Sequence, residues 1–320
     1  MRDAVLVAGG AGFIGSHLCE SLLEDGCKVV CIDSLITGER KNIEHLLLNS
    51  NFEFIEQDIT KSAKQKAQNK KLQYVFHLAS PASPNKKSER SYINHPIETL
   101  TANSIGTYQL LELARRIKAK FLYASSSEIY GNPTISPQNE SYFGNVNPNG
   151  PRSVYDEGKR FGEAMTMAYV RNHNLDARIV RIFNTYGPKM QKDDGRVVSN
   201  FVSQALNNKP ITVYGDGTQT RSFCYISDMI KGLKAAMFAK GTRGEVINLG
   251  NSDERKIADL ALLIKKLTNS SSEIIFEDLP EDDPKVRKPD IAKAKKLLKW
   301  SPRIKLEEGL ENTIEYSKNL

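Results

Sequence analysis

The amino-acid sequence predicts an α/β fold, with a doubly wound parallel sheet and a smaller, mixed C-terminal lobe. Three observations carry this prediction. Short apolar runs alternate with helical patterns along the chain, which is typical of βαβ units and a parallel sheet. A cluster of glycines directly follows the first apolar run. The length of 320 residues allows about two domains.

The glycine cluster lies in residues 5–16, whose sequence is VLVAGGAGFIGS. A buried strand turns here into a helix, and Gly9, Gly12 and Gly15 would let a pyrophosphate approach the helix N-terminus. A second apolar run ends in Asp33, about 20 residues further on, where an acid accepts hydrogen bonds from an adenosine ribose. The two motifs together predict a Rossmann-type dinucleotide site. A structural glycine turn followed by a surface aspartate is the alternative.

Further strands and helices alternate along the chain. The expected strands are residues 29–32, 52–55, 74–78, 120–124 and 246–249, and the expected helices include residues 97–117 and the stretch around Tyr155. Residues 251–320 are predicted to be mostly helical. Because ligands bind at the carboxyl ends of parallel strands, Asp58 would bind an adenine amino group and Ile59 would cover its ring. Asp58 as a loop cap is the alternative.

Tyr155 and Lys159 are the first candidates for catalysis. They follow the loop NPNGPR, where Pro151 suits a helix start. Their i, i+4 spacing puts both side chains on one helix face, so the ammonium can lower the proton affinity of the tyrosine, which then serves as a base. A surface tyrosine beside a salt-bridging lysine is the alternative. The nearby strand end SSSE, with its several hydroxyls, favours the catalytic interpretation.

Composition narrows the class of protein. No apolar run approaches the roughly 20 residues of a membrane span, and a first strand at Ala4 leaves no room for a signal peptide, so we expect a cytoplasmic protein without membrane contact. The four cysteines show neither a disulfide framework nor metal-ligand spacing. The net charge of +7 is densest in residues 61–71, without interleaved aromatic residues. We therefore expect no nucleic-acid partner, and the charge suits an anionic nucleotide substrate.

On these motifs the chain resembles the extended short-chain dehydrogenase/reductases that remodel nucleotide sugars, from residue 5 to about 316. The resemblance implies catalysis by Ser126, Tyr155 and Lys159. It also implies NAD as the cofactor, and the charge of Asp33 would repel the 2′-phosphate of NADP. The positions that match the cofactor-binding residues of the family are Gly9, Gly12, Phe13, Ile14, Gly15, Asp33, Asp58, Ile59, Leu78, Ala79, Tyr155 and Lys159.

Within this family, long segments such as NPNGPRSVYDEGKRFGEA and LPEDDPKVRKPD are similar to those of the UDP-glucuronate decarboxylases. The related 4,6-dehydratases carry Asp then Glu after the triad hydroxyl, whereas this chain has Ser127 and Glu128. It therefore lacks the acid that would protonate a departing hydroxyl. Arg287 matches the arginine that faces the substrate carboxylate, although a solvated position in a basic run is the alternative for it.

The resemblance implies decarboxylation of UDP-glucuronate to UDP-xylose through a 4-keto intermediate, with NAD regenerated in each cycle. Glu128 would organise the water or proton that returns to C5. The positions that match the substrate-binding residues are Ser127, Asn184, Arg196, Tyr214, Arg221 and Arg287. Guanidinium forks suit diphosphate oxygens, whereas a packing role is the alternative for Tyr214. We expect residues 1–180 with about 223–250 to form the NAD-binding domain, and residues 181–222 with 251–320 to form the nucleotide-sugar lobe.

Several alternatives remain open on sequence. A UDP-sugar 4-epimerase shares the triad but would not need Arg287 to meet a carboxylate. A 4,6-dehydratase is less favoured because the acid is absent. An NAD-sensing binding protein would usually lack the tyrosine or the lysine. The loop of residues 85–92 is longer and more basic than in relatives and flanks the sugar site. The family also implies a homodimer through the helices that contain Ile97 and Tyr155.

Overall fold

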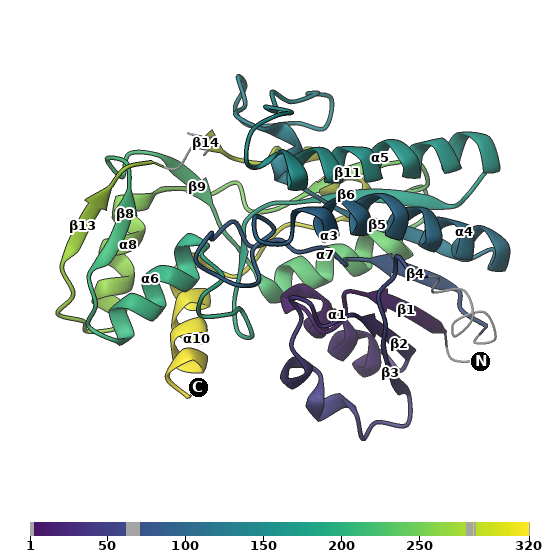
Figure 1. Ribbon diagram of the computed structural model, residues 1–320, viewed down its shortest axis with the longest axis horizontal. Helices are drawn as coiled ribbons and strands as arrows, with labels where there is room; N and C mark the ends of the chain where they lie inside the picture. Colours follow the sequence, from purple (N-terminus) through teal and green to yellow (C-terminus); the bar gives the residue numbers. More distant parts are fainter. Residues whose placement is uncertain (1–2, 62–70, 280–283, 285, 320) are drawn as a thin grey trace.

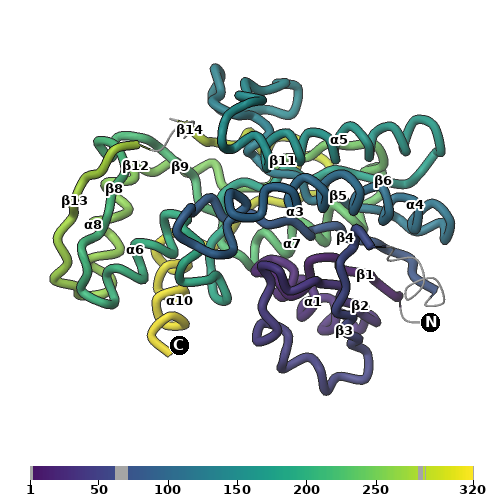
Figure 2. The backbone as a smooth tube through the Cα atoms, viewed as in Figure 1, coloured from purple at the N-terminus to yellow at the C-terminus, as the bar shows by residue number. Residues whose placement is uncertain are grey.

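The computed structural model describes residues 3–61, 71–279, 284 and 286–319. The basic tract of residues 61–71 therefore lies almost wholly outside the described residues. The chain forms a larger lobe around a seven-stranded parallel sheet and a smaller lobe beside it (Figures 1 and 2). The sheet has the order β11-β6-β5-β4-β1-β2-β3. Its strands are β1 (Ala4–Ala8), β2 (Lys28–Asp33), β3 (Phe52–Glu56), β4 (Tyr74–His77), β5 (Lys120–Ser126), β6 (Ala177–Ile182) and β11 (Val246–Leu249).

Strand β1 shows why the sheet is covered on both faces. Val5 and Val7 pack into one hydrophobic core, whereas Leu6 and Ala8 pack into a second core on the opposite face, because successive side chains of a strand point to opposite sides. A strand that is covered on both faces is apolar along its whole length. Every residue of β1 is apolar and buried. The predicted doubly wound α/β fold is confirmed.

Helices from distant parts of the chain supply these two cores. On one face lie α1 (Phe13–Glu24), α7 (Ile226–Phe238) and α9 (Ala292–Leu298). On the other lie α3 (Pro96–Thr101), the π-helical turn η3 (Ala102–Gly106), α4 (Thr107–Ile117) and α5 (Ser153–His173). The predicted helix over 97–117 thus forms with one wider turn in its middle. Among the described residues, no helix combines the length and the apolar character needed to cross a membrane.

The smaller lobe is mixed, as predicted, but residues 251–320 are less helical than expected. Its helices are α6 (Val197–Leu206), α8 (Ile257–Leu267) and α10 (Leu306–Lys318). Its strands pair as β8 (Ile211–Tyr214) with β13 (Ile274–Glu277), and as β9 (Thr220–Ser222) between β12 (Glu254–Lys256) and β14 (Val286–Arg287). A further pair, β7 (Thr185–Tyr186) with β10 (Cys224–Tyr225), leads back toward the sheet. The strands after residue 251 are too short to show a period of two, which is why the sequence pattern missed them.

One part of the expected domain division is wrong. Ile291, Leu298 and Trp300 pack into the core beside α1 and α7, and the Trp300 indole donates a hydrogen bond of 2.9 Å to the Asp228 carbonyl on α7. This segment therefore belongs with the sheet, because it buries its apolar side chains there. For the rest of the chain we propose the division into an NAD-binding domain and a nucleotide-sugar lobe that the sequence suggests.

Candidate active site

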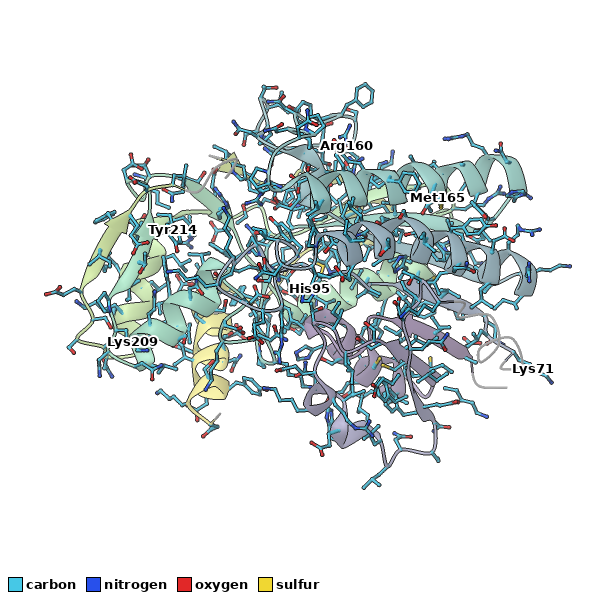
Figure 3. The ribbon with its side chains drawn as sticks, in the orientation of Figure 1. Lys71, His95, Arg160, Met165, Lys209 and Tyr214 are labelled. Carbon is cyan, nitrogen blue, oxygen red and sulfur yellow. The ribbon has the colours of Figure 1, made fainter. Side chains whose placement is uncertain are left out.

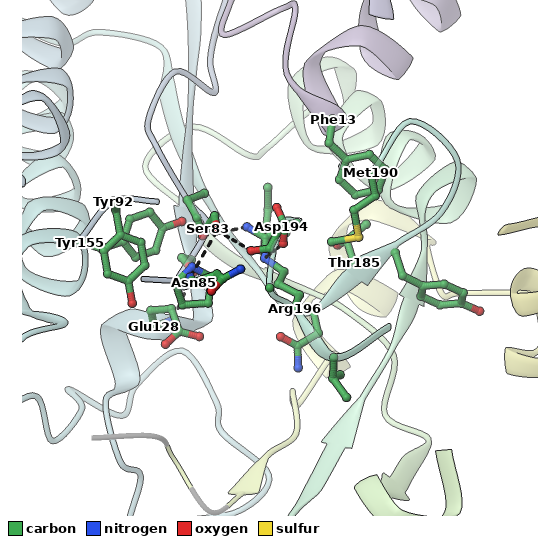
Figure 4. A pocket seen from close by; sticks show the side chains of 18 of the residues that line it. Phe13, Ser83, Asn85, Tyr92, Glu128, Tyr155, Thr185, Met190, Asp194 and Arg196 are labelled. Carbon is green, nitrogen blue, oxygen red and sulfur yellow. Dashed lines mark hydrogen bonds and ion pairs between the residues drawn. The ribbon is translucent and has the colours of Figure 1, made fainter. Parts of the chain in front are cut away.

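A pocket of about 600 Å³ opens where the carboxyl ends of the main strands face the smaller lobe (Figure 4). It extends from the glycine turn after β1 to Tyr214 at the end of β8. The predicted catalytic residues all line it: Ser126, Glu128, Tyr155, Lys159 and Arg287. The predicted substrate-binding residues line it as well: Ser127, Asn184, Arg196, Tyr214, Arg221 and Arg287. Of the cofactor set, Gly9, Gly12, Phe13, Ile14, Gly15, Leu78, Tyr155 and Lys159 line the pocket, whereas Asp33, Asp58, Ile59 and Ala79 lie outside its lining.

The glycine turn fits a dinucleotide pyrophosphate. Gly9 has φ +81°, and a Cβ there would lie 2.6 Å from the Ala79 amide nitrogen, so no other residue fits without a shift. A Cβ at Gly15 would collide with the Gly9 carbonyl oxygen. Gly12 is the N-cap of α1 and offers no capping side chain. The first N–H groups of the helix, which have no partner within it, therefore remain for an anionic ligand.

Asp33 lies at the end of β2 beside this turn. Its carboxylate accepts hydrogen bonds of 2.9 Å from the main-chain N–H groups of Ala11 and Leu35. Each oxygen has a second lone pair, so the carboxylate retains capacity for ribose hydroxyls. Burial raises the pKa of Asp33, and the main-chain hydrogen bonds act against that shift.

Asp58 and Ile59 follow β3 and lie outside the lining of the pocket. Asp58 Oδ1 accepts hydrogen bonds of 2.8 Å from both the N–H and the hydroxyl of Thr60, so it does cap the turn. The Ile59 side chain is buried in the core, where a Cβ at Gly106 would lie 2.5 Å from its Cδ1. The expectation that this side chain covers an adenine ring is therefore wrong, because it packs into the core.

Tyr155 and Lys159 project from α5 toward the end of β5. Lys159 Nζ donates a hydrogen bond of 2.9 Å to the Ala124 carbonyl and lies 5.7 Å from the centroid of the Tyr155 ring. Burial lowers the pKa of Lys159 to about 7. Burial also raises the pKa of Tyr155 to about 12, although the charge of Arg196 and the hydroxyl of Ser126 act to lower it. Removal from water disfavours the charged form of each side chain, so burial opposes the lowering of the Tyr155 pKa that the sequence leads us to expect from the Lys159 ammonium.

Arg287 and Glu128 form a buried ion pair at the base of the pocket. Arg287 is 1% exposed, which excludes a solvated position in a basic run. Its Nη1 lies 3.2 Å from Glu128 Oε1 and also donates to the Ser127 carbonyl, and its Nη2 donates to the Gly131 carbonyl at 3.0 Å. Arg287 Nε is buried without a hydrogen-bond partner in the described part of the chain. An acceptor on a ligand would satisfy this N–H, whose burial is otherwise costly.

Glu128 stays ionised because two arginines face it. Burial alone would raise its pKa, but the charges of Arg287 and Arg152 outweigh this effect and hold the pKa of Glu128 well below its usual value. Arg152 Nη2 lies 2.5 Å from Glu128 Oε2. The carboxylate is therefore a hydrogen-bond acceptor at neutral pH and holds no proton of its own to donate.

Strand pairing brings further cations to the same pocket. β9 and β14 run parallel with Arg221 opposite Arg287, and Arg221 Nη2 donates to the Pro284 carbonyl at 2.5 Å. Arg196 Nη2 donates to the Ala82 carbonyl at 2.9 Å, and its Nε lies 3.4 Å from Asp194 Oδ1. This excess of guanidinium groups suits a ligand with several negative charges.

Arg152 and Tyr92 are among the lining residues that the sequence analysis did not single out. Arg152 lies one turn before Tyr155 on the same helix face, a spacing that would have indicated it. The Tyr92 ring stacks on the Tyr155 ring, with centroids 5.1 Å apart and planes 14° apart (Figure 4). No local pattern marks Tyr92, because this contact joins segments that are distant in sequence.

Comparisons with known proteins identify the family of the chain. UDP-glucuronic acid decarboxylase 1 of Xenopus tropicalis is 48% identical over 315 residues, covering 98% of this chain and 72% of the relative. UDP-glucuronic acid decarboxylase 3 of Arabidopsis thaliana is 48% identical over 307 residues, covering 96% and 86%. The crystal structure of the Bacillus cereus UDP-glucuronic acid 4-epimerase in complex with UDP-glucuronic acid and NAD has a TM-score of 0.87 at 35% identity, covering 99% of both chains. The model of the NAD dependent epimerase/dehydratase family matches residues 5–250, and the chain belongs to that family.

Proposed function

We propose that the protein is an NAD-dependent decarboxylase that converts UDP-glucuronate to UDP-xylose and carbon dioxide. The observation that carries this proposal is the buried, fixed guanidinium of Arg287 beside Glu128 in the catalytic pocket. Such a group recognises a carboxylate. The identity of 46–48% to several curated UDP-glucuronic acid decarboxylases supports the same substrate.

The residues of the larger lobe would hold the dinucleotide. The N–H groups after Gly12 suit its pyrophosphate, Asp33 its adenosine ribose, and the two remaining N–H donors of Lys159 the second ribose. NAD, when bound, supplies the acceptor and later the donor of a hydride, and in its oxidised form a positive charge. Because the hydride returns to the sugar in each cycle, the protein needs no net supply of cofactor.

Tyr155 would remove the proton of the C4 hydroxyl, while Ser126 hydrogen-bonds the same oxygen. A phenol whose pKa is raised to about 12 by burial is a weak acid near neutral pH, so the reaction requires positive charge near it. Lys159 and Arg196 supply this charge from the protein. The same two hydroxyls would then stabilise the enolate oxygen that develops as carbon dioxide leaves.

Arg287 would orient the substrate carboxylate without holding it too tightly. A carboxylate that leaves as neutral carbon dioxide loses its charge, so strong binding of the ground state would raise the barrier. Glu128 already neutralises part of the Arg287 charge at 3.2 Å. This sharing leaves the guanidinium able to position the group while limiting the ground-state attraction.

Glu128 would then direct the proton that returns to C5. Since it stays ionised between Arg287 and Arg152, it acts as an acceptor that holds and orients a water molecule. One proton from solvent is consumed for each carbon dioxide released. Asn184, Arg196, Tyr214 and Arg221 would bind the uridine diphosphate on the side of the smaller lobe.

A UDP-sugar 4-epimerase is the second candidate, because the B. cereus epimerase shares the fold closely. UDP-glucuronate labelled with ¹⁴C at its carboxyl group distinguishes the two. A decarboxylase releases labelled carbon dioxide in proportion to the substrate consumed. Complete retention of the label, with formation of the C4 epimer, would refute decarboxylation and support the epimerase.

We also propose a homodimer in a reducing, cytoplasmic compartment. Apolar side chains are exposed along α3, η3, α4 and α5: Ile97, Leu100, Ile105, Tyr108 and Phe161. Burial of this surface against a second copy would remove them from water. All four cysteines are free and buried, which fits a compartment without disulfide formation. Light scattering after gel filtration tests the dimer, and Ile105→Asp is expected to give monomers.

A further inference from the structure

Residues 83–93 form a strap across the pocket. They connect β4 to α3 and are drawn in Figures 1 and 2 as the dark blue loop between the two lobes. In Figure 3, His95, which follows the strap, lies near the centre of the molecule, and Tyr214 lies in the smaller lobe. The strap residues that line the pocket are Ser83, Pro84, Asn85, Lys86, Lys87, Arg90, Tyr92 and Ile93.

One side of the strap is tied to the loop that precedes α6 in the smaller lobe. Ser88 Oγ donates a hydrogen bond of 2.9 Å to Asp193 Oδ2, and Asn85 Nδ2 donates one of 3.0 Å to the Asp193 carbonyl. The Ser83 hydroxyl donates to the Asp194 carbonyl (Figure 4). The packing is close, since a Cβ at Gly195 would collide with the Asn85 Cβ.

The other side of the strap is tied to the loop after Asp33. Arg90 Nη1 lies 2.5 Å from Glu39 Oε1, and the Glu39 side chain is 14% exposed. Gln191 Nε2 donates a hydrogen bond of 2.8 Å to the Thr37 carbonyl, which links the same loop to the smaller lobe. Thr37 itself lines the pocket. The strap, the loop after Asp33 and the loop before α6 therefore enclose the part of the pocket next to the glycine turn.

Internal hydrogen bonds make the strap a compact unit. Asn94 Nδ2 donates to the Lys86 and Ser88 carbonyls at 3.0 and 2.7 Å. The Tyr92 N–H donates to the Ser83 carbonyl at 2.9 Å, which closes the base of the loop. A loop tied together in this way is a compact unit, and its outer attachments are the contacts to Asp193, Asp194 and Glu39.

We propose that the strap retains the dinucleotide, and that cofactor exchange requires the Arg90–Glu39 and Ser88–Asp193 contacts to separate. This proposal rests on NAD binding and is independent of which UDP-sugar reacts. Retention would serve a cycle in which the cofactor is reduced and reoxidised without leaving. Arg90 and Ser88 are then positioning residues, because they act through the strap.

The test measures release of NAD from the purified protein without any sugar. Protein loaded with NAD is mixed with excess 1,N⁶-etheno-NAD, and its fluorescence change gives the exchange rate. Loss of a partly buried ion pair or hydrogen bond predicts release about 3- to 10-fold faster for Arg90→Gln and for Ser88→Ala. Glu89→Gln is the matched control, since Glu89 neighbours Arg90 but is exposed and outside the pocket lining.

Exchange of the two charges tests whether the Arg90–Glu39 ion pair itself holds the strap, or whether any substitution there loosens it. The double variant Glu39→Arg with Arg90→Glu is expected to restore slow release to within about two-fold of the wild type, if the ion pair is what holds the strap. Wild-type release rates in both Arg90→Gln and Ser88→Ala, or equal acceleration by Glu89→Gln, would overturn the proposal. If Arg90→Gln does not fold, as judged by circular dichroism, Ser88→Ala decides alone.

Discussion

The Arg287–Glu128 pair allows a prediction of magnitude. Arg287→Met removes a buried cation from a carboxylate at 3.2 Å and from two carbonyls. Breaking a buried pair costs roughly 3–5 kcal/mol, because the remaining charge is left uncompensated. Glu128 retains Arg152 at 2.5 Å, so we expect about 2–3 kcal/mol here. Glu128→Gln instead leaves Arg287 without its carboxylate partner, and we expect it to lower the free energy of unfolding by about 2 kcal/mol.

The double variant should cost less than the sum of the single variants. When Glu128→Gln and Arg287→Met are combined, neither charge is left buried alone, so we expect a coupling energy of about 1.5–2 kcal/mol. Urea unfolding of the four proteins at pH 7, followed by circular dichroism, measures it. Additive costs, within about 0.3 kcal/mol, would refute the view that the two side chains form one unit.

The pH dependence of this coupling follows from Glu128. Against the effect of burial, Arg287 and Arg152 lower its pKa from 4.5 to about 2. A carboxyl whose folded pKa is lowered contributes stability that is present above its unfolded pKa and is lost as the pH falls through the folded value. The coupling energy is therefore expected to be constant from pH 5 to 8 and to fall between about pH 4.5 and 2. A coupling that weakens already between pH 8 and 6 would contradict the ionised assignment.

Three further predictions concern the residues around Tyr155. Tyr155→Phe removes the base and is expected to lower kcat by at least about 10³-fold, with NAD affinity by titration unchanged; a near wild-type rate would exclude Tyr155 as the base. Burial lowers the pKa of Lys159 from 10.5 to about 7. The buried charge therefore lowers the free energy of unfolding by its full amount below pH 7, and this loss of stability disappears as the pH rises to 10.5. Lys159→Met should therefore be more stable than the wild type by roughly 2–4 kcal/mol at pH 6, with no advantage at pH 11. Urea unfolding at the two pH values measures this difference. A gain in stability that does not depend on pH would exclude the buried charge as its cause. Tyr92→Phe removes a buried hydroxyl that has no partner among the described residues. The unfolding free energy of this variant should therefore stay within about 1 kcal/mol of the wild type or rise. Tyr92→Ala removes the ring that stacks on Tyr155 and should lower kcat at saturating substrate.

The sequence predicted features that depend on local pattern. The wholly apolar run of β1 and the glycines after it indicated the sheet and the dinucleotide site, because a buried parallel strand and a tight turn each leave a local trace. The i, i+4 spacing placed Tyr155 and Lys159 on one helix face. Arg287 was found by resemblance, but its pairing with Glu128 joins two segments far apart in the chain, and no local pattern encodes it.

The errors have the same origin. Ile59 follows a strand end, where ligands bind, but its side chain packs into the core, in the space that Gly106 leaves by having no side chain. The strands after residue 251 form only because β8 and β9 offer them an edge. The burial that raises the pKa of Tyr155 depends on contacts with distant segments, among them the stacked ring of Tyr92. Each outcome is decided by tertiary contacts, which periodicity and spacing do not contain.

The most direct test of the decarboxylase assignment is proton NMR of UDP-glucuronate incubated in D₂O with the protein and NAD. We expect UDP-xylose to appear with one deuterium at C5, since the departing carboxyl group is replaced by a hydron from solvent, and no NADH to accumulate. Conversion to the C4 epimer with the carboxyl group retained, or persistence of UDP-glucuronate with folded, NAD-loaded protein, would contradict the assignment.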